Sequence, residues 1–351
     1  MHSPSTYLKS GYLKSGLVLL LSLTLLSACV QSEPVSGQLE LSNVTASGEP
    51  SLGLFDDWLT MSRVATPLPE EWTGLKVQDT ATLRLVNQSA DEALHVTRLT
   101  LDPDAPFTLE SPSLPLHIAP SAFFDLNVTF TENEGERGVR RASLQVVSSG
   151  GASEVQLAGV FMERPEGNSE VNLQQIVDAF GYTTDIGLQG ERLSETPDSP
   201  LAGDEVRSKL WERADPSEVV YVREIAAYHG CCDEENFIEI TGPGGGRFFH
   251  AASYAQSVLP LIAEGSGPAQ MSVRPTSAFE IVVGAADDNY TTNTEGNLGV
   301  RLWPAKDRAG ELIPNTYIIA EDYVQSGCGQ GFANCDYQDN VFLITNVQPA
   351  Q

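Results

Sequence analysis

The stretch Phe124-Asp-Leu-Asn-Val-Thr-Phe130 alternates apolar and polar residues, a period of two that is typical of a β-strand with one buried face. The same alternation runs through residues 81–86 and 155–161. Turn-forming sequences such as Asp102-Pro-Asp-Ala-Pro106 and Ser148-Ser-Gly-Gly151 separate these runs. Short alternating strands at this spacing predict an antiparallel β-sandwich over residues 38–162.

A second set of strand-like runs, rich in aromatic and β-branched residues, lies between residue 205 and the C-terminus. The runs are residues 218–228, 236–241, 247–250, 279–284, 299–303, 315–322 and 340–347. They predict a second, larger sandwich of jelly-roll type over residues 205–351. The expected fold class is therefore all-β, with two β-sandwich domains and one or two short helices.

The linker between these domains, residues 163–204, contains one segment with helical spacing. Its apolar residues fall on one face between Asn172, which can cap a helix, and Gly181, which can end one. The rest of the linker is polar, with two prolines and three glycines in residues 187–204, and predicts a long loop. A second short helix is expected within residues 253–261.

The N-terminus has the three parts of a secretion signal: a basic region with Lys9 and Lys14, an apolar run over residues 17–26, and Leu26-Ser-Ala-Cys29. The apolar run is shorter than the roughly 20 residues that a membrane-spanning helix needs. The last four residues resemble the lipobox of bacterial lipoproteins. That resemblance implies removal of residues 1–28, lipidation of Cys29, a tether over residues 29–37, and a place at the bacterial outer membrane or cell surface.

The net charge of the chain limits the kinds of partner that it can bind, and its cysteine content bears on disulfides. A formal net charge of −27 repels nucleic acid and anionic lipid, so no nucleic-acid partner is expected and the membrane is contacted through the lipid anchor alone. Besides Cys29, the chain contains Cys231, Cys232, Cys328 and Cys335. An even number of cysteines in a secreted chain favours disulfides. A Cys328–Cys335 bridge would leave Cys231 and Cys232 as a vicinal pair, and cross-pairing of the two loops is the alternative.

Four segments of the first half carry a family resemblance. They are Thr80-Ala-Thr-Leu-Arg-Leu-Val-Asn87, Leu114-Pro-Leu-His-Ile-Ala-Pro120, Leu126-Asn-Val-Thr-Phe130 and Val155-Gln-Leu-Ala-Gly159. In order and spacing they resemble the immunoglobulin-like domains of bacterial surface proteins related to the abnormal-spindle and hydin type, over about residues 75–162. The resemblance implies a seven-stranded sandwich used as a spacer or docking module, without a catalytic residue.

The densest group of acidic and amide side chains lies near the C-terminus. It comprises Glu321, Asp322, Asp336, Asp339 and Asn340. A strand end followed by a loop can turn these oxygens toward one another, and calcium takes six to eight oxygen ligands. Without a cation, carboxylates packed this closely would repel one another and their pKa values would rise. The alternative is a solvated acidic loop.

Asp288 lies in a further acidic stretch, residues 287–293, which either completes the same metal site or forms a polar hairpin turn.

The segments Ala320-Glu-Asp-Tyr323 and Asp336-Tyr-Gln-Asp-Asn-Val-Phe342 also resemble the closing motif of a class of secreted bacterial β-sandwich domains. That resemblance implies calcium stabilisation and association with carbohydrate-binding or adhesive modules. Gln338 departs from the motif, where asparagine or aspartate is common, and this puts one ligand in doubt.

Enzyme signatures are absent from the sequence: it contains no HExxH, GxSxG, P-loop or CxxCH motif. We therefore expect a calcium-stabilised, lipid-anchored surface protein that binds carbohydrate or a cell-envelope component and is not an enzyme. One alternative is a purely structural envelope protein. The other is a glycoside hydrolase that uses two of the four carboxylates at positions 321, 322, 336 and 339, which would then have to line a groove.

Overall fold

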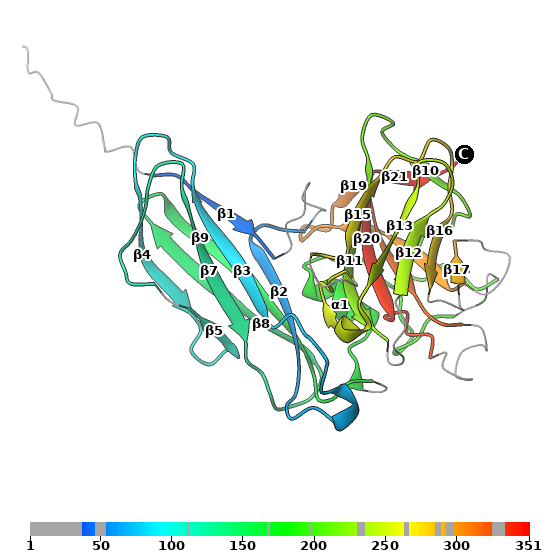
Figure 1. Ribbon diagram of the computed structural model, residues 1–351, viewed down its shortest axis with the longest axis horizontal. Coiled ribbons are helices and arrows are strands. Elements are labelled where there is room, and N and C mark those ends of the chain that lie inside the picture. The colour runs from blue at the N-terminus through cyan, green and yellow to red at the C-terminus, as the bar shows by residue number, and fades with distance from the viewer. Residues whose placement is uncertain are drawn as a thin grey trace, which may run out of the picture. The chain divides into compact units, whose positions relative to one another are not determined.

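The structure is a computed structural model that describes residues 37–351, except residues 46–53, 111, 167–168, 195, 197, 230–235, 263–266, 285–288, 293–297 and 325–333. The predicted signal sequence and five of the predicted site residues, Cys29, Cys231, Cys232, Cys328 and Asp288, lie outside the described residues. Strands make up nearly all of the regular secondary structure of the described chain, which confirms the all-β prediction (Figure 1).

The first sandwich has two sheets. One contains β1 (Leu39–Asn43), β3 (Thr80–Asn87), β7 (Phe123–Phe130) and β5 (Phe107–Leu109), in that order. The other contains β2 (Trp58–Val64), β9 (Gly151–Met162), β8 (Gly138–Ser148), β4 (Leu94–Leu101) and β6 (Leu116–Ile118). Neighbouring strands are antiparallel except β2 and β9, which are parallel.

Alternation along the strands builds the core of this sandwich, as the sequence predicts. Leu126, Val128 and Phe130 of β7 are fully buried, whereas Asp125 and Asn127 face outward. Close packing continues across the interior, where a Cβ atom on Gly159 of β9 would overlap the ring of Phe130. This position therefore requires glycine.

The second sandwich is larger. Its main sheet contains β14 (Gln256–Val258), β11 (Val220–Tyr228), β20 (Asn340–Thr345), β19 (Leu312–Glu321) and β18 (Val300–Lys306), and β15 (Gln270–Val273) also pairs with β11. The facing sheet contains β13 (Gly246–His250), β12 (Asn236–Ile240), β16 (Ile281–Gly284) and β17 (Asn289–Thr291). A separate pair joins β10 (Trp211–Arg213) to β21 (Val347–Pro349). Phe248 of one sheet packs edge-on against Phe342 of the other.

The predicted linker helix is confirmed as α1 (Leu173–Ala179). Asn172 and Gln175 form a capping box, in which each side chain accepts a hydrogen bond from the other's backbone N–H, at 2.9 and 3.1 Å. Gly181, with φ +82°, ends the helical segment. The indole Nε1 of Trp58 on β2 donates to the Ala179 carbonyl at 2.7 Å, which ties the end of α1 to the first sandwich.

The prediction of a second short helix within residues 253–261 is wrong. A short 3-10 turn (Ala252–Tyr254) is followed by strand β14, which pairs with β11. The hydroxyl of Ser257 lies 3.1 Å from that of Ser62 on β2, so tertiary contacts on both sides hold this segment extended. Among the residues that the structure describes, no helix has the length and apolar character to cross a membrane.

Candidate functional site

Strands β19 and β20 bring the predicted acidic residues together. They pair in a register that places Glu321 opposite Asn340, and Asn340 Nδ2 donates to Glu321 Oε2 at 2.7 Å. Asp322, the next residue, accepts a hydrogen bond from the Tyr337 backbone N–H at 3.1 Å. Glu321, Asp322 and Asn340 are all fully buried, so a solvated loop does not describe this end of the sheet.

The loop before β20 adds Asp336 and Gln338 to this group. Gln338 Nε2 donates to Asp336 Oδ2 at 3.0 Å and to Glu170 Oε2 at 3.1 Å. Gln338, which the sequence marks as a departure from the motif, is therefore at the centre of the arrangement. We call the group the acidic cluster; it consists of Glu170, Glu321, Asp322, Asp336, Gln338, Asp339 and Asn340.

Sequence reasoning missed Glu170. It lies in a stretch of linker that looks solvent-exposed in the sequence, 168 positions before Gln338, and no local periodicity connects the two. The structure buries it, with only 4 % of its surface exposed. The only available signal was a glutamate just before a capped helix, and that is too common a feature to indicate a site.

Burial and mutual repulsion perturb the carboxylates of the acidic cluster, as the sequence predicts. Burial raises the pKa of Glu170 to about 9, against opposing hydrogen bonds and with the added like charge of Glu166 and Asp336. Burial and the nearby charge of Asp322 raise the pKa of Asp336 to about 8. Burial, followed by the charge of Asp322, also raises the pKa of Asp339 well above its ordinary value. In this geometry the cluster favours either bound protons or a bound cation.

Three oxygen atoms in the acidic cluster are available to accept a hydrogen bond or to bind a cation. Asp336 Oδ1, Gln338 Oε1 and Asn340 Oδ1 are buried and accept no hydrogen bond from the described residues. Leaving a buried acceptor unsatisfied costs about 1–3 kcal/mol, so native structures usually supply a partner such as a water or an ion. Carboxylate and amide oxygens are the ligands that calcium prefers.

The cluster does not form a finished metal site in its present arrangement. Among the described residues, no three Asp, Glu, His or Cys side chains converge closely enough to hold a metal ion. One reason is visible in the hydrogen bonds, because the amide NH₂ group of Gln338 donates to the carboxylates of both Glu170 and Asp336. In this arrangement an amide donor bridges these two carboxylates.

Cys335 is the one predicted disulfide cysteine that lies among the described residues. It is fully buried and immediately precedes Asp336. Because the other three cysteines lie outside the described residues, the pairing stays a prediction.

A second buried polar group consists of Glu224 on β11, His229 directly after β11, and His250 on β13. His250 Nδ1 is 2.9 Å from Glu224 Oε2, and His250 Nε2 is 3.0 Å from the Nε2 atom of His229. Burial lowers the pKa of His229 well below its ordinary value, so this imidazole is neutral. A proton on His229 Nε2 and another on His250 Nδ1 would satisfy the whole chain of hydrogen bonds.

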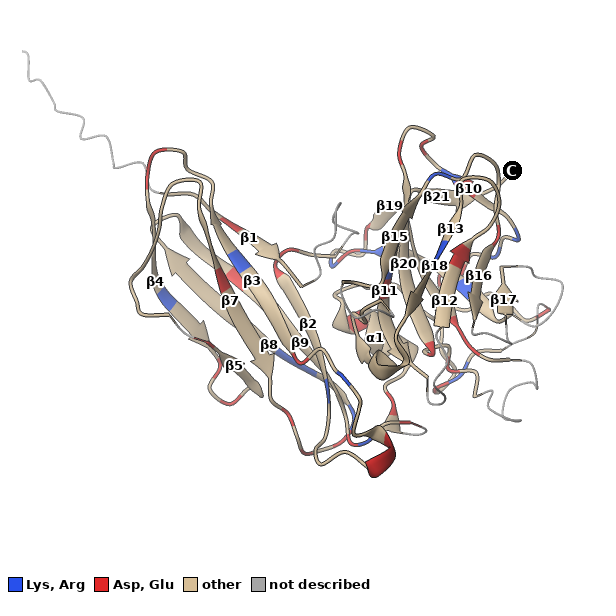
Figure 2. Cartoon of the chain, viewed as in Figure 1, with Lys and Arg blue, Asp and Glu red and all other residues tan. Residues whose placement is uncertain are grey.

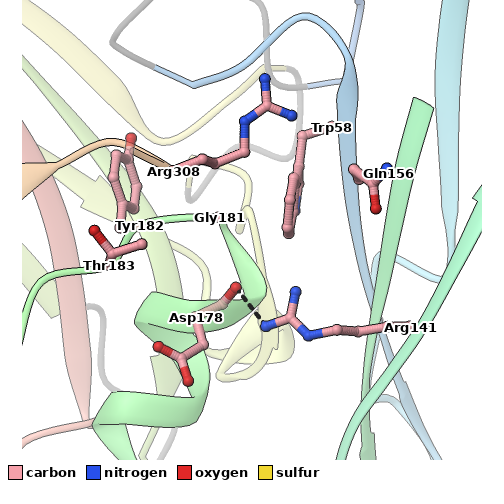
Figure 3. Close-up of a pocket in the computed structure, with 8 residues that line it drawn as sticks. All are labelled: Trp58, Arg141, Gln156, Asp178, Gly181, Tyr182, Thr183 and Arg308. Carbon is pink, nitrogen blue, oxygen red and sulfur yellow. Dashed lines mark hydrogen bonds between the residues drawn. The ribbon is translucent and has the colours of Figure 1, made fainter. Parts of the chain in front are cut away.

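A pocket of about 670 Å³ adjoins the end of α1 (Figure 3). Trp58 forms one wall, and the guanidinium groups of Arg141 and Arg308 lie 5.5 and 5.8 Å from its ring centre. Arg141 Nη2 donates to the Asp178 carbonyl at 2.8 Å. The remaining lining residues are Gln156, Gly181, Tyr182 and Thr183. Two arginines in one pocket stand out in a chain with 20 basic and 47 acidic residues (Figure 2).

Comparisons with known proteins give only distant likenesses. No family model matches the chain, and no curated protein matches its sequence. Among solved structures, the chain is similar to a PapD-like domain of human CEP192, with 14 % identity over 44 % of this chain and 99 % of that one, at a TM-score of 0.22. It is also similar to the YadV chaperone, with 13 % identity over 79 % and 96 % and a TM-score of 0.24. Likenesses this distant carry no information about activity.

Proposed function

We propose that the protein is a lipid-anchored bacterial cell-surface binding protein, stabilised by calcium, that recognises carbohydrate or another cell-envelope component. The observation that carries the proposal is the acidic cluster, where buried carboxylates with raised pKa values lie beside three buried oxygens that accept no hydrogen bond from the described residues. A divalent cation would relieve the repulsion and satisfy these oxygens together.

The donor set favours calcium over other metals. All its candidate ligands are carboxylate or amide oxygens, which suit hard cations, and it offers neither the sulfur nor the imidazole that zinc prefers. Magnesium needs near-ideal octahedral geometry and usually keeps several waters, which a buried, irregular set of oxygens does not suit. Asp322, Asp336, Asp339 and Asn340 would hold the ion, with Glu321 orienting Asn340 through its hydrogen bond.

The pocket beside α1 is the place we assign to the ligand. Its volume of about 670 Å³ is that of an ordinary small-molecule site. Trp58 is largely buried, with 9 % of its surface exposed, while Gln156, Thr183 and the arginines supply donors and acceptors for hydroxyl groups. This polar rim suits the hydroxyl groups of a sugar.

The two rival functions fit the geometry less well. A glycoside hydrolase needs two carboxylates that face each other across an open cleft, about 5–9.5 Å apart. Glu321 and Asp322 are instead fully buried. A purely structural protein would have no use for the pocket, although it could still bind calcium.

Metal analysis and glycan binding test the two parts of this proposal. Purified protein, stripped of metal and then equilibrated with calcium, should retain calcium after gel filtration. Binding to a glycan array should weaken in Arg141→Gln, which alters the pocket, and persist in Arg98→Gln, which alters an exposed residue of β4. Failure to retain calcium would remove the calcium part. Silence of the folded, calcium-loaded protein on the array would favour the structural alternative.

A further inference from the structure

The pocket beside α1 offers a sugar ring little aromatic surface on which to stack. Trp58 and Tyr182, its two aromatic residues, are both buried. The exposed side chains of the lining are those of Arg141, Thr183 and Arg308, and all three are polar. A hydrogen bond between neutral groups replaces one to water, so it adds little net affinity. Tight binding in this pocket therefore requires a stronger contact than sugar hydroxyl groups make by themselves.

Arg141 supplies a positive charge that no carboxylate offsets. Arg308 Nη2 lies 3.0 and 2.9 Å from the two carboxylate oxygens of Asp57, which balances the charge of Arg308. Among the described residues, no acidic side chain forms an ion pair with Arg141. The carboxylate of Asp178 points away from Arg141 (Figure 3) and accepts a hydrogen bond from Gln174 Nε2 at 2.9 Å.

Two contacts hold the guanidinium group of Arg141 at the pocket. Its Nη2 donates to the Asp178 carbonyl at 2.8 Å (Figure 3), and its central carbon lies 5.5 Å from the ring centre of Trp58. A guanidinium carries several N–H donors, and among the described residues only this carbonyl accepts from it. A guanidinium that is already held in place loses little freedom when it binds a planar anion through two parallel hydrogen bonds.

The negative charge of the whole chain does not cancel this local attraction. Salt at physiological strength largely screens exposed charges that lie more than about 8 Å apart. An anion that contacts Arg141 therefore interacts mainly with this guanidinium and its close neighbours. Hydrogen bonds to an ionised group are also roughly twice as strong as those between neutral groups, which supplies the stronger contact that the pocket requires.

We propose that the ligand of this pocket is an acidic glycan, in which a carboxylate or sulfate group on a sugar pairs with Arg141. Gln156 and Thr183 then bind the hydroxyl groups of the same sugar. The proposal rests on the proposed function, because it takes this pocket as the ligand site, and it is independent of calcium. Uronic acids and sulfated sugars share the required chemistry, and the experiment separates them.

A glycan array that presents matched acidic and neutral sugars tests the proposal. The pairs are glucuronic acid with glucose, galacturonic acid with galactose, and sulfated galactose with galactose. Purified wild type should bind the acidic member of at least one type of pair about tenfold or more tightly than its neutral counterpart. Preference within the uronic acid pairs or within the sulfated pair identifies the acidic group.

Variants of Arg141 then show whether this residue causes the preference. Arg141→Gln removes the charge and keeps an amide donor, so its affinity for the acidic glycan should fall at least about tenfold and its preference should disappear. Arg141→Lys keeps the charge without the planar fork, so it should retain the preference at lower affinity. The control Arg98→Gln, at an exposed position of β4, should behave like wild type. Melting temperatures of the variants separate loss of binding from loss of folding.

Equal binding of the acidic and neutral members of every pair would overturn the proposal, and this comparison needs no variant. Retention of the wild-type preference in folded Arg141→Gln would overturn it as well. Both results leave a glycan-binding protein, so the proposed function stands. Folded wild type that binds no glycan on the array refutes the carbohydrate part of the proposed function together with this proposal.

Discussion

Raising the pH should destabilise the metal-free protein, because the folded acidic cluster holds protons that the unfolded chain releases. The pKa of Glu170 is about 9 in the folded protein, against an ordinary value of 4.5. Between these two values the folded state binds more protons, so the free energy of unfolding falls as pH rises. One such group contributes about 1.4 kcal/mol per pH unit, or about 4 kcal/mol between pH 5 and pH 8.

Asp336 acts in the same direction, with its pKa raised from 3.8 to about 8. Its contribution does not simply add, because the charge of Asp336 is itself one of the causes that raise the pKa of Glu170. The stabilising effect of both groups is complete at acid pH, below the ordinary carboxyl pKa values, and is lost on approach to pH 8–9. Calcium should remove most of this pH dependence above pH 6, since it binds the ionised carboxylates.

Urea unfolding of protein stripped on a chelating resin, at pH 5, 6, 7 and 8, measures the effect. Trp211 and Trp303 are fully buried in the second sandwich and report its unfolding by fluorescence. A loss of about 4 kcal/mol lowers the urea midpoint by roughly 1.3–4 M at slopes of about 1–3 kcal/mol per M. The side chain of Glu170→Gln cannot ionise. Metal-free Glu170→Gln should therefore be more stable than wild type at pH 8 and about as stable as wild type at pH 5. The control Glu218→Gln, which changes an exposed residue of the second sandwich, should behave like wild type. Equal wild-type stability at pH 5 and pH 8 would refute the reasoning from burial.

Three further substitutions test the packing. Arg301→Met leaves the buried Glu205 carboxylate with Arg207 alone and should cost about 3 kcal/mol in urea unfolding; a loss below 1 kcal/mol would mean that the ion pair is not desolvated. Asn172→Ala removes the helix cap and should cost about 1 kcal/mol, visible as faster hydrogen exchange in α1, and unchanged exchange would speak against the capping box. Gly159→Ala forces a methyl group against Phe130 and should lower stability by about 1–3 kcal/mol, whereas a neutral result would show that the ring can move aside.

Local pattern is sufficient to predict most strands and the linker helix. The alternation over residues 124–130 matches β7, and the helical face between Asn172 and Gly181 matches α1, because each signal lies within one element. Pairing partners are harder to predict, since β11 pairs with β20 more than 100 residues later. The expected strand over residues 340–347 divides at Asn346, whose φ of +60° breaks it into β20 and β21. Residues 256–258 form a strand because of contacts with β11 and β2 that no local pattern reveals.

The residues of the acidic cluster could be predicted only in part, because local sequence patterns do not reveal contacts between distant segments. Glu321 and Asn340 are only 19 positions apart, so their meeting at one sheet end follows from an antiparallel pairing of neighbouring segments of the chain. Glu170 arrives from a distant segment through tertiary packing, and only the folded chain shows its approach to Asp336. The burial that raises these pKa values is likewise a property of the assembled sandwich.

The melting temperature of metal-stripped protein at pH 8, measured before and after addition of millimolar calcium chloride, tests the central claim most directly. Calcium present at about 1,000 times its Kd adds about 4 kcal/mol, which corresponds to a rise of roughly 8–16 °C for a domain of 150–250 residues. The account predicts a rise of this size with calcium and a much smaller one with magnesium. An unchanged melting temperature would contradict a calcium site in the acidic cluster.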